Sequence, residues 1–408
     1  MKKTIVLGLV LASFSFQAQD KAVFKHVESK YYNNSIMKGV ETFEETKEVA
    51  KEHKSIAVDH TGKDYPKSPS KYKSVWYMDP ISQGNTGTCW CFSTSSFYES
   101  EIKRQTGKQV DISEMYTVYW EYVERARYFV QNRGEMTLGE GSETNALSKI
   151  MNVYGAVPAA DYTGMLPGQT FHNHEPMFME IEQYLLGVKE RNAWNVDEVV
   201  NTVKSILEHY MGKVPTQVTV DGKKMSPQEY LKKYLKINPS DYVNFMSLMQ
   251  HDYYTKAVYD VPDNWWRSND YNNVPLDDFM NIIKSAVKNN YSISIGGDVS
   301  EAGFDKEEQV AIVPDFDIPS ANINDAARQL RFSNGATTDD HAMHLVGYKE
   351  VKGKTWFLIK DSGSGSRNCG PECESFGYYF MHEDYIKLKM MTITVHKDAV
   401  AEYLAKMK

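Results

Sequence analysis

The sequence predicts an α+β protein with two lobes, the first mainly helical and the second rich in strands. Helical apolar periodicity recurs through the first part of the chain, whereas short alternating segments typical of strands follow residue 290. Helices first and strands later is the order expected of an α+β fold. With 408 residues, 41% of them hydrophobic and 25% charged, the chain is long enough for one large core or two to three domains.

The first residues have the pattern of a secretory signal peptide, which we expect to span residues 1–18. Lys2 and Lys3 precede the apolar stretch Ile5–Phe14, and Ala18 offers a small residue at a cleavage point. The stretch is too short for a stable membrane span. An uncleaved anchor and an ordinary N-terminal strand are the alternatives. The pattern predicts a secreted or periplasmic protein without stable membrane insertion.

Residues 19–75 are polar and lysine-rich, and we expect them to form an N-terminal extension over the main domain, 76–400. Three helices are predicted at the start of that domain. They run from Cys89 to about Gln105, from Ser113 to Val130, and from about Ser142 to Tyr154, each with apolar residues three and four apart or a clear stop signal.

The rest of the domain divides into a helical insertion and a β-rich part. Residues 160–290 are expected to be mainly helical, which places the helical lobe at about 76–289 and the β-rich lobe at about 290–397. A C-terminal helix is expected over 398–408. The predicted helices of the insertion are Val196–Tyr210, Pro227–Tyr234 and Leu276–Lys288, and the predicted strands are Tyr291–Gly297, Met343–Tyr348, Trp356–Lys360, Gly377–Met381 and Met390–His396.

Charge and cysteine content exclude several classes of function. The net charge is −8 and no cluster of Lys and Arg stands out, so a nucleic-acid partner is not expected. Only four cysteines are present. Cys369 and Cys373 lie in a short turn-rich loop and favour a local disulfide; a metal site is the alternative, but no further ligands follow at a recognisable spacing. We expect no metal and no cofactor.

Cys89 is the candidate nucleophile. A glycine-rich stretch precedes it, and the predicted helix begins at or near it, so free N–H groups and the helix dipole would stabilise a thiolate. Its backbone N–H could also face an oxyanion. Taken alone, a free cysteine is more often a small buried hydrophobe than a nucleophile, and that is the expected role of Cys91 two positions later.

The run Gln83-Gly-Asn-Thr-Gly-Thr-Cys89-Trp90-Cys-Phe resembles the active-site segment of papain-like cysteine peptidases. The resemblance implies a papain-like two-lobed fold, with the cysteine on the helical lobe and the histidine on the β-rich lobe. It implies that Cys89 attacks a peptide carbonyl, that the Gln83 side chain donates to the oxyanion, and that Trp90 is the tryptophan beside the substrate.

Two later segments complete the resemblance. Asp340-His341-Ala-Met-His344 matches the run that carries the catalytic histidine, which assigns that role to His341 and leaves His344, on the opposite face of a strand, as structural. Asp361 stands where the family has asparagine, and Gly363 stands where it has tryptophan. An aspartate can still accept from the imidazole and favour its charged form. The loop Gly365–Ser375 is a candidate for the missing cover.

The match extends over about residues 75–400 and is most similar to the bleomycin hydrolase and aminopeptidase C branch. Asp111–Phe129 and Glu140–Pro158 are the segments that carry this likeness. It implies that Gly141 and Ser142 line the non-primed side of the cleft and pair with substrate backbone. It also implies a peptide or protein substrate.

Members of that branch have a C-terminal arm that enters the active site, makes them aminopeptidases and accompanies a hexameric assembly. This chain ends at Lys408, soon after the predicted helix, so an endopeptidase is the alternative to an aminopeptidase, and an oligomer is possible without being implied. An acyl transferase with the same triad, and a silent binding protein on the same scaffold, are the further alternatives.

Overall fold

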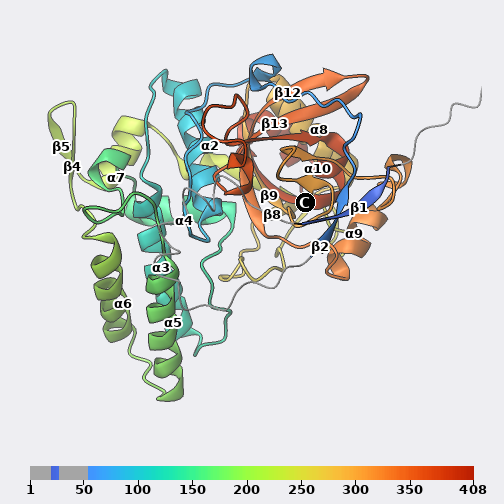
Figure 1. The fold of residues 1–408 in the computed structure, drawn as a ribbon. Coiled ribbons are helices and arrows are strands. Elements are labelled where there is room, and N and C mark those ends of the chain that lie inside the picture. The colour runs from blue at the N-terminus through green and yellow to red at the C-terminus, as the bar shows by residue number, and fades with distance from the viewer. Residues whose placement is uncertain (1–19, 27–53) are drawn as a thin grey trace, which may run out of the picture.

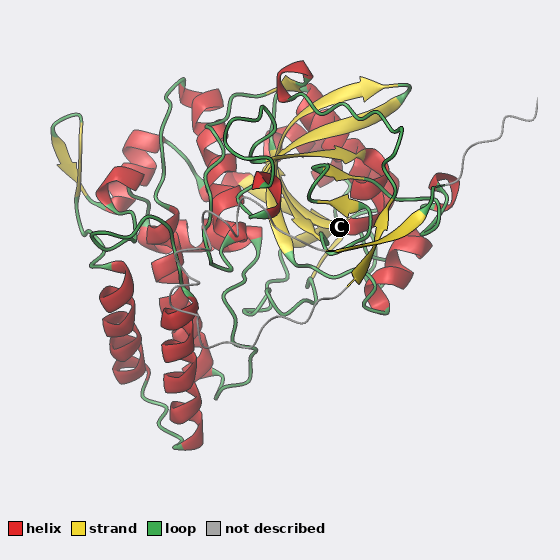
Figure 2. Ribbon diagram, in the orientation of Figure 1, coloured by secondary structure: helices red, strands yellow, loops and turns green. Residues whose placement is uncertain are grey.

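The computed structural model describes residues 20–26 and 54–408, and the signal peptide expected at residues 1–18 lies outside them. The helices from the first part of the chain gather on one side of the molecule, and most strands lie on the other together with the later helices, as Figures 1 and 2 show. The two-lobed α+β prediction is therefore confirmed.

The helical lobe is built on three helices that the sequence predicted to within two residues at each end. In α3, Met115, Tyr119 and Tyr122 are buried on one face, as the spacing required. The helices of this lobe are α2 (Cys89–Thr106), α3 (Glu114–Gln131), α4 (Thr144–Tyr154), α5 (Glu175–Glu190), α6 (Val196–Met211) and α7 (Pro227–Glu229), and a π-helical segment (Tyr230–Leu235) continues α7. A hairpin of β4 (Val218–Val220) and β5 (Lys223–Met225) lies beside them.

The second lobe is one large sheet with helices beside it. The strands are β3 (Lys73–Ser74), β6 (Tyr242–Met246), β7 (Thr255–Ala257), β8 (Tyr271–Asn273), β9 (Ile293–Gly297), β10 (Phe304–Asp305), β11 (Val310–Ala311), β12 (His341–Val351), β13 (Lys354–Lys360), β14 (Tyr378–His382) and β15 (Met390–His396). Their order is β10-β11-β14-β13-β12-β9-β15-β6-β8-β7, with β3 paired to β12. The helices are α8 (Leu276–Lys288), α9 (Asp325–Ser333), α10 (Glu383–Lys389) and α11 (Ala401–Leu404).

The expected boundary between the lobes at residue 289 is wrong. Strands β6, β7 and β8 come from 242–273, inside the stretch expected to be helical, and they belong to the large sheet. These strands are three to five residues long, too short to show an alternating pattern among the surrounding polar residues. The C-terminal helix is also shorter than expected, because Lys397–Val400 is 3-10 helical and only Ala401–Leu404 is α-helical.

Helix α2 joins the lobes, because it packs directly against β12 and β9. The contact is polar as well as apolar: the Thr94 hydroxyl lies 3.1 Å from that of Ser294, and the Ser96 hydroxyl lies 2.9 Å from Nδ1 of His344. These buried partners fix the helix against the sheet. The N-terminus of α2, which carries Cys89, is thereby held beside the first residue of β12, His341.

The two ends of the described chain lie on the β-rich lobe. β1 (Ala22–His26) pairs with β2 (Lys54–Val58), and the His60 imidazole that follows lies 3.1 Å from the Asp305 carboxylate. At the other end, the backbone N–H of Lys408 donates to the carbonyl of Tyr254 at 2.8 Å.

Candidate active site

Cys89 is the first residue of α2 and is partly exposed. The loop before it turns through Gly84, which has φ of 68°, and a Cβ at Gly84 would overlap the carbonyl of His172. The backbone N–H of Asn85 donates to that same carbonyl at 2.7 Å. A tight glycine loop therefore delivers the cysteine to a helix N-terminus, where unpaired N–H groups and the helix dipole favour a thiolate.

His341 and Asp361 come from the ends of two adjacent strands. His341 begins β12, and Asp361 follows β13, whose Lys360 is paired with His344. Nε2 of His341 donates to Oδ1 of Asp361 at 2.6 Å, and Oδ2 of Asp361 accepts from the N–H of Gly363 at 3.0 Å. This bond leaves Nδ1 of the imidazole available to the thiol.

The charges of this trio reinforce one another. Burial alone would lower the pKa of His341, but the Asp361 carboxylate and the Cys89 sulfur beside it raise that pKa well above its ordinary value. Burial would raise the pKa of Asp361, but His341 and Arg367 hold it below its usual range. The arrangement favours a thiolate–imidazolium pair with the carboxylate ionised behind it.

Gln83 is held as an oxyanion donor would have to be. Its Oε1 accepts from the hydroxyl of Ser362 at 2.8 Å, and its Nε2 donates one hydrogen to the carbonyl of Thr86 at 2.7 Å. These two bonds define which end of the amide is nitrogen. The second hydrogen on Nε2 is left for the cleft, which Gln83 lines together with His341.

Cys91 and His344 lie apart from this chemistry. The Cys91 thiol is fully buried and donates to the carbonyl of Glu114 at 3.3 Å. His344 is also fully buried, and burial together with nearby Lys360 lowers its pKa well below its ordinary value. Both residues have the structural positions that the sequence predicted for them.

A cleft of about 640 Å³ opens beside this trio; His341 and Asp361 line it, and so does the loop that ends at Cys89, although Cys89 itself is not a lining residue. On one side it is bounded by the loop before Cys89 and by two acidic side chains, and on the other by two segments of the β-rich lobe. The lining residues are Gln83, Gly84, Asn85, Thr86, Gly87, Glu140, Glu175, Val299, Phe304, Lys306, His341, Asp361, Gly363, Ser364, Gly365 and Tyr379. No segment from either end of the described chain is among them.

The side of the cleft beyond His341 is built by the loop that follows Asp361. Arg367 is buried and donates to the carbonyls of Gly363 at 2.5 Å, Ile81 at 2.8 Å and Asp361 at 3.0 Å. Gly363 and Gly365 line the cleft. A Cβ at Gly363 would lie 3.3–3.4 Å from imidazole atoms of His341, so a side chain at this position would press against the ring.

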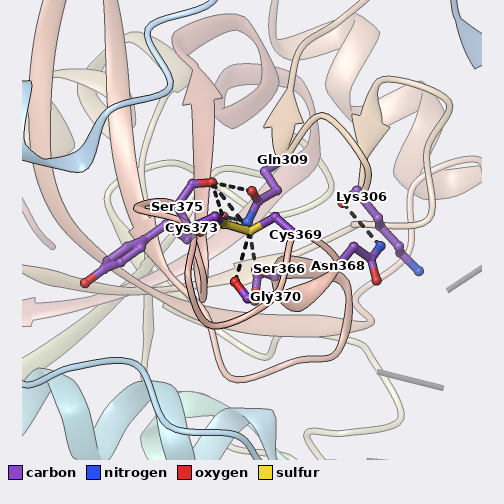
Figure 3. Close-up of a disulfide and its surroundings, with 9 residues drawn as sticks. Lys306, Gln309, Ser366, Asn368, Cys369, Gly370, Cys373 and Ser375 are labelled. Atoms are coloured by element: carbon purple, nitrogen blue, oxygen red, sulfur yellow. Dashed lines mark hydrogen bonds between the residues drawn. A yellow bond between two sulfur atoms is a disulfide. The ribbon is translucent and has the colours of Figure 1, made fainter. Parts of the chain in front are cut away.

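A disulfide between Cys369 and Cys373 closes the outer part of this loop (Figure 3). Gln309 ties the loop to β11, because its Nε2 donates to the carbonyls of Ser366 and Ser375, both at 2.7 Å. Asn368 donates to the carbonyl of Lys306 at 3.3 Å. The disulfide-bearing part lies outside the cleft lining, so only Gly365 of the expected cover segment reaches the cleft.

The expected substrate contacts on the opposite side are corrected by the structure. Trp90 is 1% exposed and lies in the core, where its Nε1 donates to the carbonyl of Glu140 at 3.4 Å. It therefore positions the cleft wall and does not line the cleft. Gly141 and Ser142 are not part of the cleft lining either, because other side chains already contact them.

Glu140 is a cleft residue that sequence reasoning missed. Its Oε2 accepts from the N–H of Gly87 at 2.9 Å, two residues before Cys89. Burial raises the pKa of this carboxyl. The sequence held one clue, since Glu140 is next to Gly141 in the segment already singled out for substrate binding. Lys306 and Glu175 carried no such clue.

Among residues 20–26 and 54–408, no three His, Cys, Asp or Glu side chains gather as a metal site. In the same part of the chain, no helix combines the length and the apolar character needed to span a bilayer.

Comparison with known proteins agrees with this geometry. The profile described as "Peptidase C1-like family" matches residues 23–162 and 217–408. The chain is 20% identical to aminopeptidase G of Lactobacillus delbrueckii subsp. lactis, over 80% of this chain and 81% of the relative. It is 22% identical to aminopeptidase C of Listeria innocua, over 81% and 82%.

Two further relatives complete the comparison. Cysteine proteinase 1, mitochondrial, of Saccharomyces cerevisiae is 21% identical over 79% of this chain and 76% of its own. A crystal structure of pepw from Lactobacillus rhamnosis superposes with a TM-score of 0.66 at 18% identity, covering 83% of this chain and 84% of that chain. The papain-like fold is thereby confirmed. The chain belongs to the Peptidase C1-like family and is a papain-like cysteine peptidase.

Proposed function

We propose that this peptidase is an aminopeptidase in which Cys89, His341 and Asp361 hydrolyse the peptide bond after the first residue of a substrate. The observation that carries the chemical part is the bond of 2.6 Å between His341 and Asp361 at the N-terminus of the helix that begins with Cys89. This geometry places the His341 imidazole, whose pKa is raised, beside the Cys89 sulfur before any substrate arrives.

The reaction follows from the positions of these groups. The Cys89 thiolate attacks the scissile carbonyl, and the negative charge that develops on oxygen is met by the Cys89 N–H and by Nε2 of Gln83. His341 then gives its proton to the leaving amine, and the acyl-enzyme forms. Water, deprotonated by neutral His341, hydrolyses the thioester and returns the enzyme to its starting state.

Two observations favour release of single N-terminal residues over internal cleavage. Relatives at 20–22% identity are named aminopeptidases. In addition, Gly141 and Ser142, which an extended substrate would meet on the non-primed side, already have partners: Arg125 donates to the carbonyl of Gly141, and Trp265 donates to the side-chain hydroxyl of Ser142. A substrate is left with little room on the N-terminal side of its scissile bond.

An irreversible epoxide inhibitor of papain-like enzymes tests the nucleophile. We expect one label per molecule of wild type, on Cys89, and no peptide hydrolysis by Cys89→Ala. Cys91→Ala is the matched control, and it should still be labelled on Cys89. Turnover that persists in Cys89→Ala would contradict the assignment.

A peptide and its N-acetylated twin test the mode of cleavage. Rapid release of the first residue from the free peptide alone supports an aminopeptidase. Equal cleavage of both peptides would make it an endopeptidase.

We also propose that the protein is exported. The charged and apolar pattern of residues 1–18 supports this, and the Cys369–Cys373 disulfide is compatible with an oxidising compartment. N-terminal sequencing of protein from the periplasm or culture medium is the test. A mature chain that begins near residue 19 is expected, whereas an intact Met1 on cytosolic protein would contradict export.

A further inference from the structure

The non-primed side of the cleft is closed by a segment of this chain that lies between β7 and β8. Trp265, 5% exposed, donates from Nε1 to Oε1 of Glu121 at 2.7 Å and to the hydroxyl of Ser142 at 3.3 Å. Arg125 donates to the carbonyl of Gly141. The cleft lining stops short of these contacts, because Gly87 and Glu140 are lining residues whereas Gly141 and Ser142 are not.

Asp263, two residues before Trp265, places its carboxylate directly on Gly141. A Cβ at Gly141 would overlap both carboxylate oxygens. Asp263 accepts no hydrogen bond from any residue in the described part of the chain. Burial raises its pKa, and Arg125 opposes the rise only in part. A carboxylate that packs on Gly141, next to the cleft residue Glu140 but not itself a lining residue, thus has no hydrogen-bond partner among the described residues.

Two more acids stand behind it, one from each lobe. Glu143 is 3% exposed, and its Oε1 has no hydrogen-bond partner among the described residues, while Oε2 accepts from the hydroxyl of Tyr271 at 3.2 Å. Glu143 lies against Asp339 and within electrostatic reach of Asp263. Asp339 precedes His341 by two residues, and burial raises its pKa to about 7.

Within residues 20–26 and 54–408, none of these three acids forms an ion pair with a basic side chain. Arg125 partly opposes the rise in the pKa of Asp263, but it is itself paired with Glu121 at 2.7 Å. Two carboxylates close to each other in a buried place repel and tend to hold a proton between them. A cation supplied by a ligand would remove that repulsion, and the N-terminal ammonium of a peptide bound with its first residue beside Cys89 arrives at this end of the cleft.

We propose that Asp263, supported by Glu143 and Asp339, binds the α-ammonium group of the substrate and is the residue that makes the enzyme specific for free N-termini. The proposal rests on the aminopeptidase function given above and names the residue that recognises the N-terminus of the substrate. That residue comes from the loop between β7 and β8, within the body of the chain. An acylated N-terminus has no ammonium charge to pair with these carboxylates, and it presents a carbonyl oxygen that they repel. Binding of an acylated substrate is therefore disfavoured.

The test uses the full chain and two substrates, the aminomethylcoumarin amide of alanine and its N-acetylated twin. Asp263→Asn should lower kcat/KM for the free amine by about 10- to 100-fold, mostly through KM, because one charge-assisted hydrogen bond is lost. It should leave the N-acetyl substrate unchanged or improved. Asp260→Asn, in the same loop but exposed and paired with Arg267 at 3.1 Å, is the matched control and should behave as wild type.

The outcomes separate this proposal from the function on which it rests. If wild type prefers the free amine and Asp263→Asn keeps that preference, the assignment of Asp263 is overturned while the aminopeptidase stands. If wild type cleaves both substrates equally, the aminopeptidase function fails first. Asp263→Glu keeps the charge and should retain more of the preference than Asp263→Asn, which excludes a purely structural loss. Epoxide labelling of Cys89 in each variant reports whether the site is intact.

Discussion

His341 and His344 lie three residues apart on β12, yet the fold shifts their pKa values in opposite directions. His341 faces Cys89 and Asp361, and its pKa is raised; His344 faces Ser96 on α2 with Lys360 nearby, and its pKa is lowered. An odd spacing on a strand sends the two side chains to opposite faces. Burial acts on both rings in the same direction. At His341 the adjacent Asp361 carboxylate and Cys89 sulfur therefore outweigh desolvation, whereas at His344, which has no such partners, burial favours the neutral ring.

The largest expected effect comes from His341→Ala. Loss of the proton acceptor and donor should lower kcat by at least about 10³-fold with the fold intact. Steady-state hydrolysis together with thermal unfolding checks this. A variant that keeps more than a small fraction of wild-type turnover would remove the distinction between the two histidines.

Asp361→Asn sharpens the same distinction by removing the charge and keeping the shape. Because the carboxylate raises the pKa of His341, its loss lowers that pKa, and the imidazolium is then lost at a lower pH. The alkaline limb of the kcat/KM profile should move to lower pH, and activity at pH 8 should fall about 10- to 100-fold. This loss is smaller than the ~10⁴-fold loss of kcat that the matching Asp-to-Asn change causes in a serine triad. An unmoved alkaline limb would contradict the assigned cause.

His344→Ala should destabilise the protein without changing its chemistry. It removes a buried ring and leaves the Ser96 hydroxyl without its partner at 2.9 Å, which costs about 2–4 kcal/mol in the free energy of unfolding. Chemical denaturation measures the loss, and kcat per epoxide-titrated site should stay near wild type. A large fall in that kcat would give His344 a part in catalysis.

The smallest effect is expected from Cys369→Ser combined with Cys373→Ser. The disulfide closes a loop of a few residues outside the cleft lining, so its removal should cost below about 2 kcal/mol. Buried Arg367 still holds Gly363 by its own hydrogen bond. The pH profile should not move, because neither sulfur faces His341, and a moved profile would show that the loop tunes the imidazole.

The sequence was sufficient for residues whose surroundings are local. Cys89 follows a glycine loop, and the helix after it has an uninterrupted pattern, so its place at a helix start was predictable. The acidic character of the closed, non-primed end of the cleft was not predictable. Asp263 and Gly141 meet there only after the chain has passed through α4, α5 and α6. Strands β6 to β8 were missed for a related reason: their pairing partners lie elsewhere in the chain.

The segment between the two matched parts of the chain, residues 163–216, includes α5 and α6 and meets the loop that carries Gln83. The carbonyl of His172 accepts from Asn85, and the N–H of His174 donates back to the carbonyl of Asn85 at 3.1 Å. An insert that falls outside the family profile thus forms part of the wall behind the oxyanion donor. A change in this segment that moved His172 or His174 would therefore also move the loop that carries Gln83.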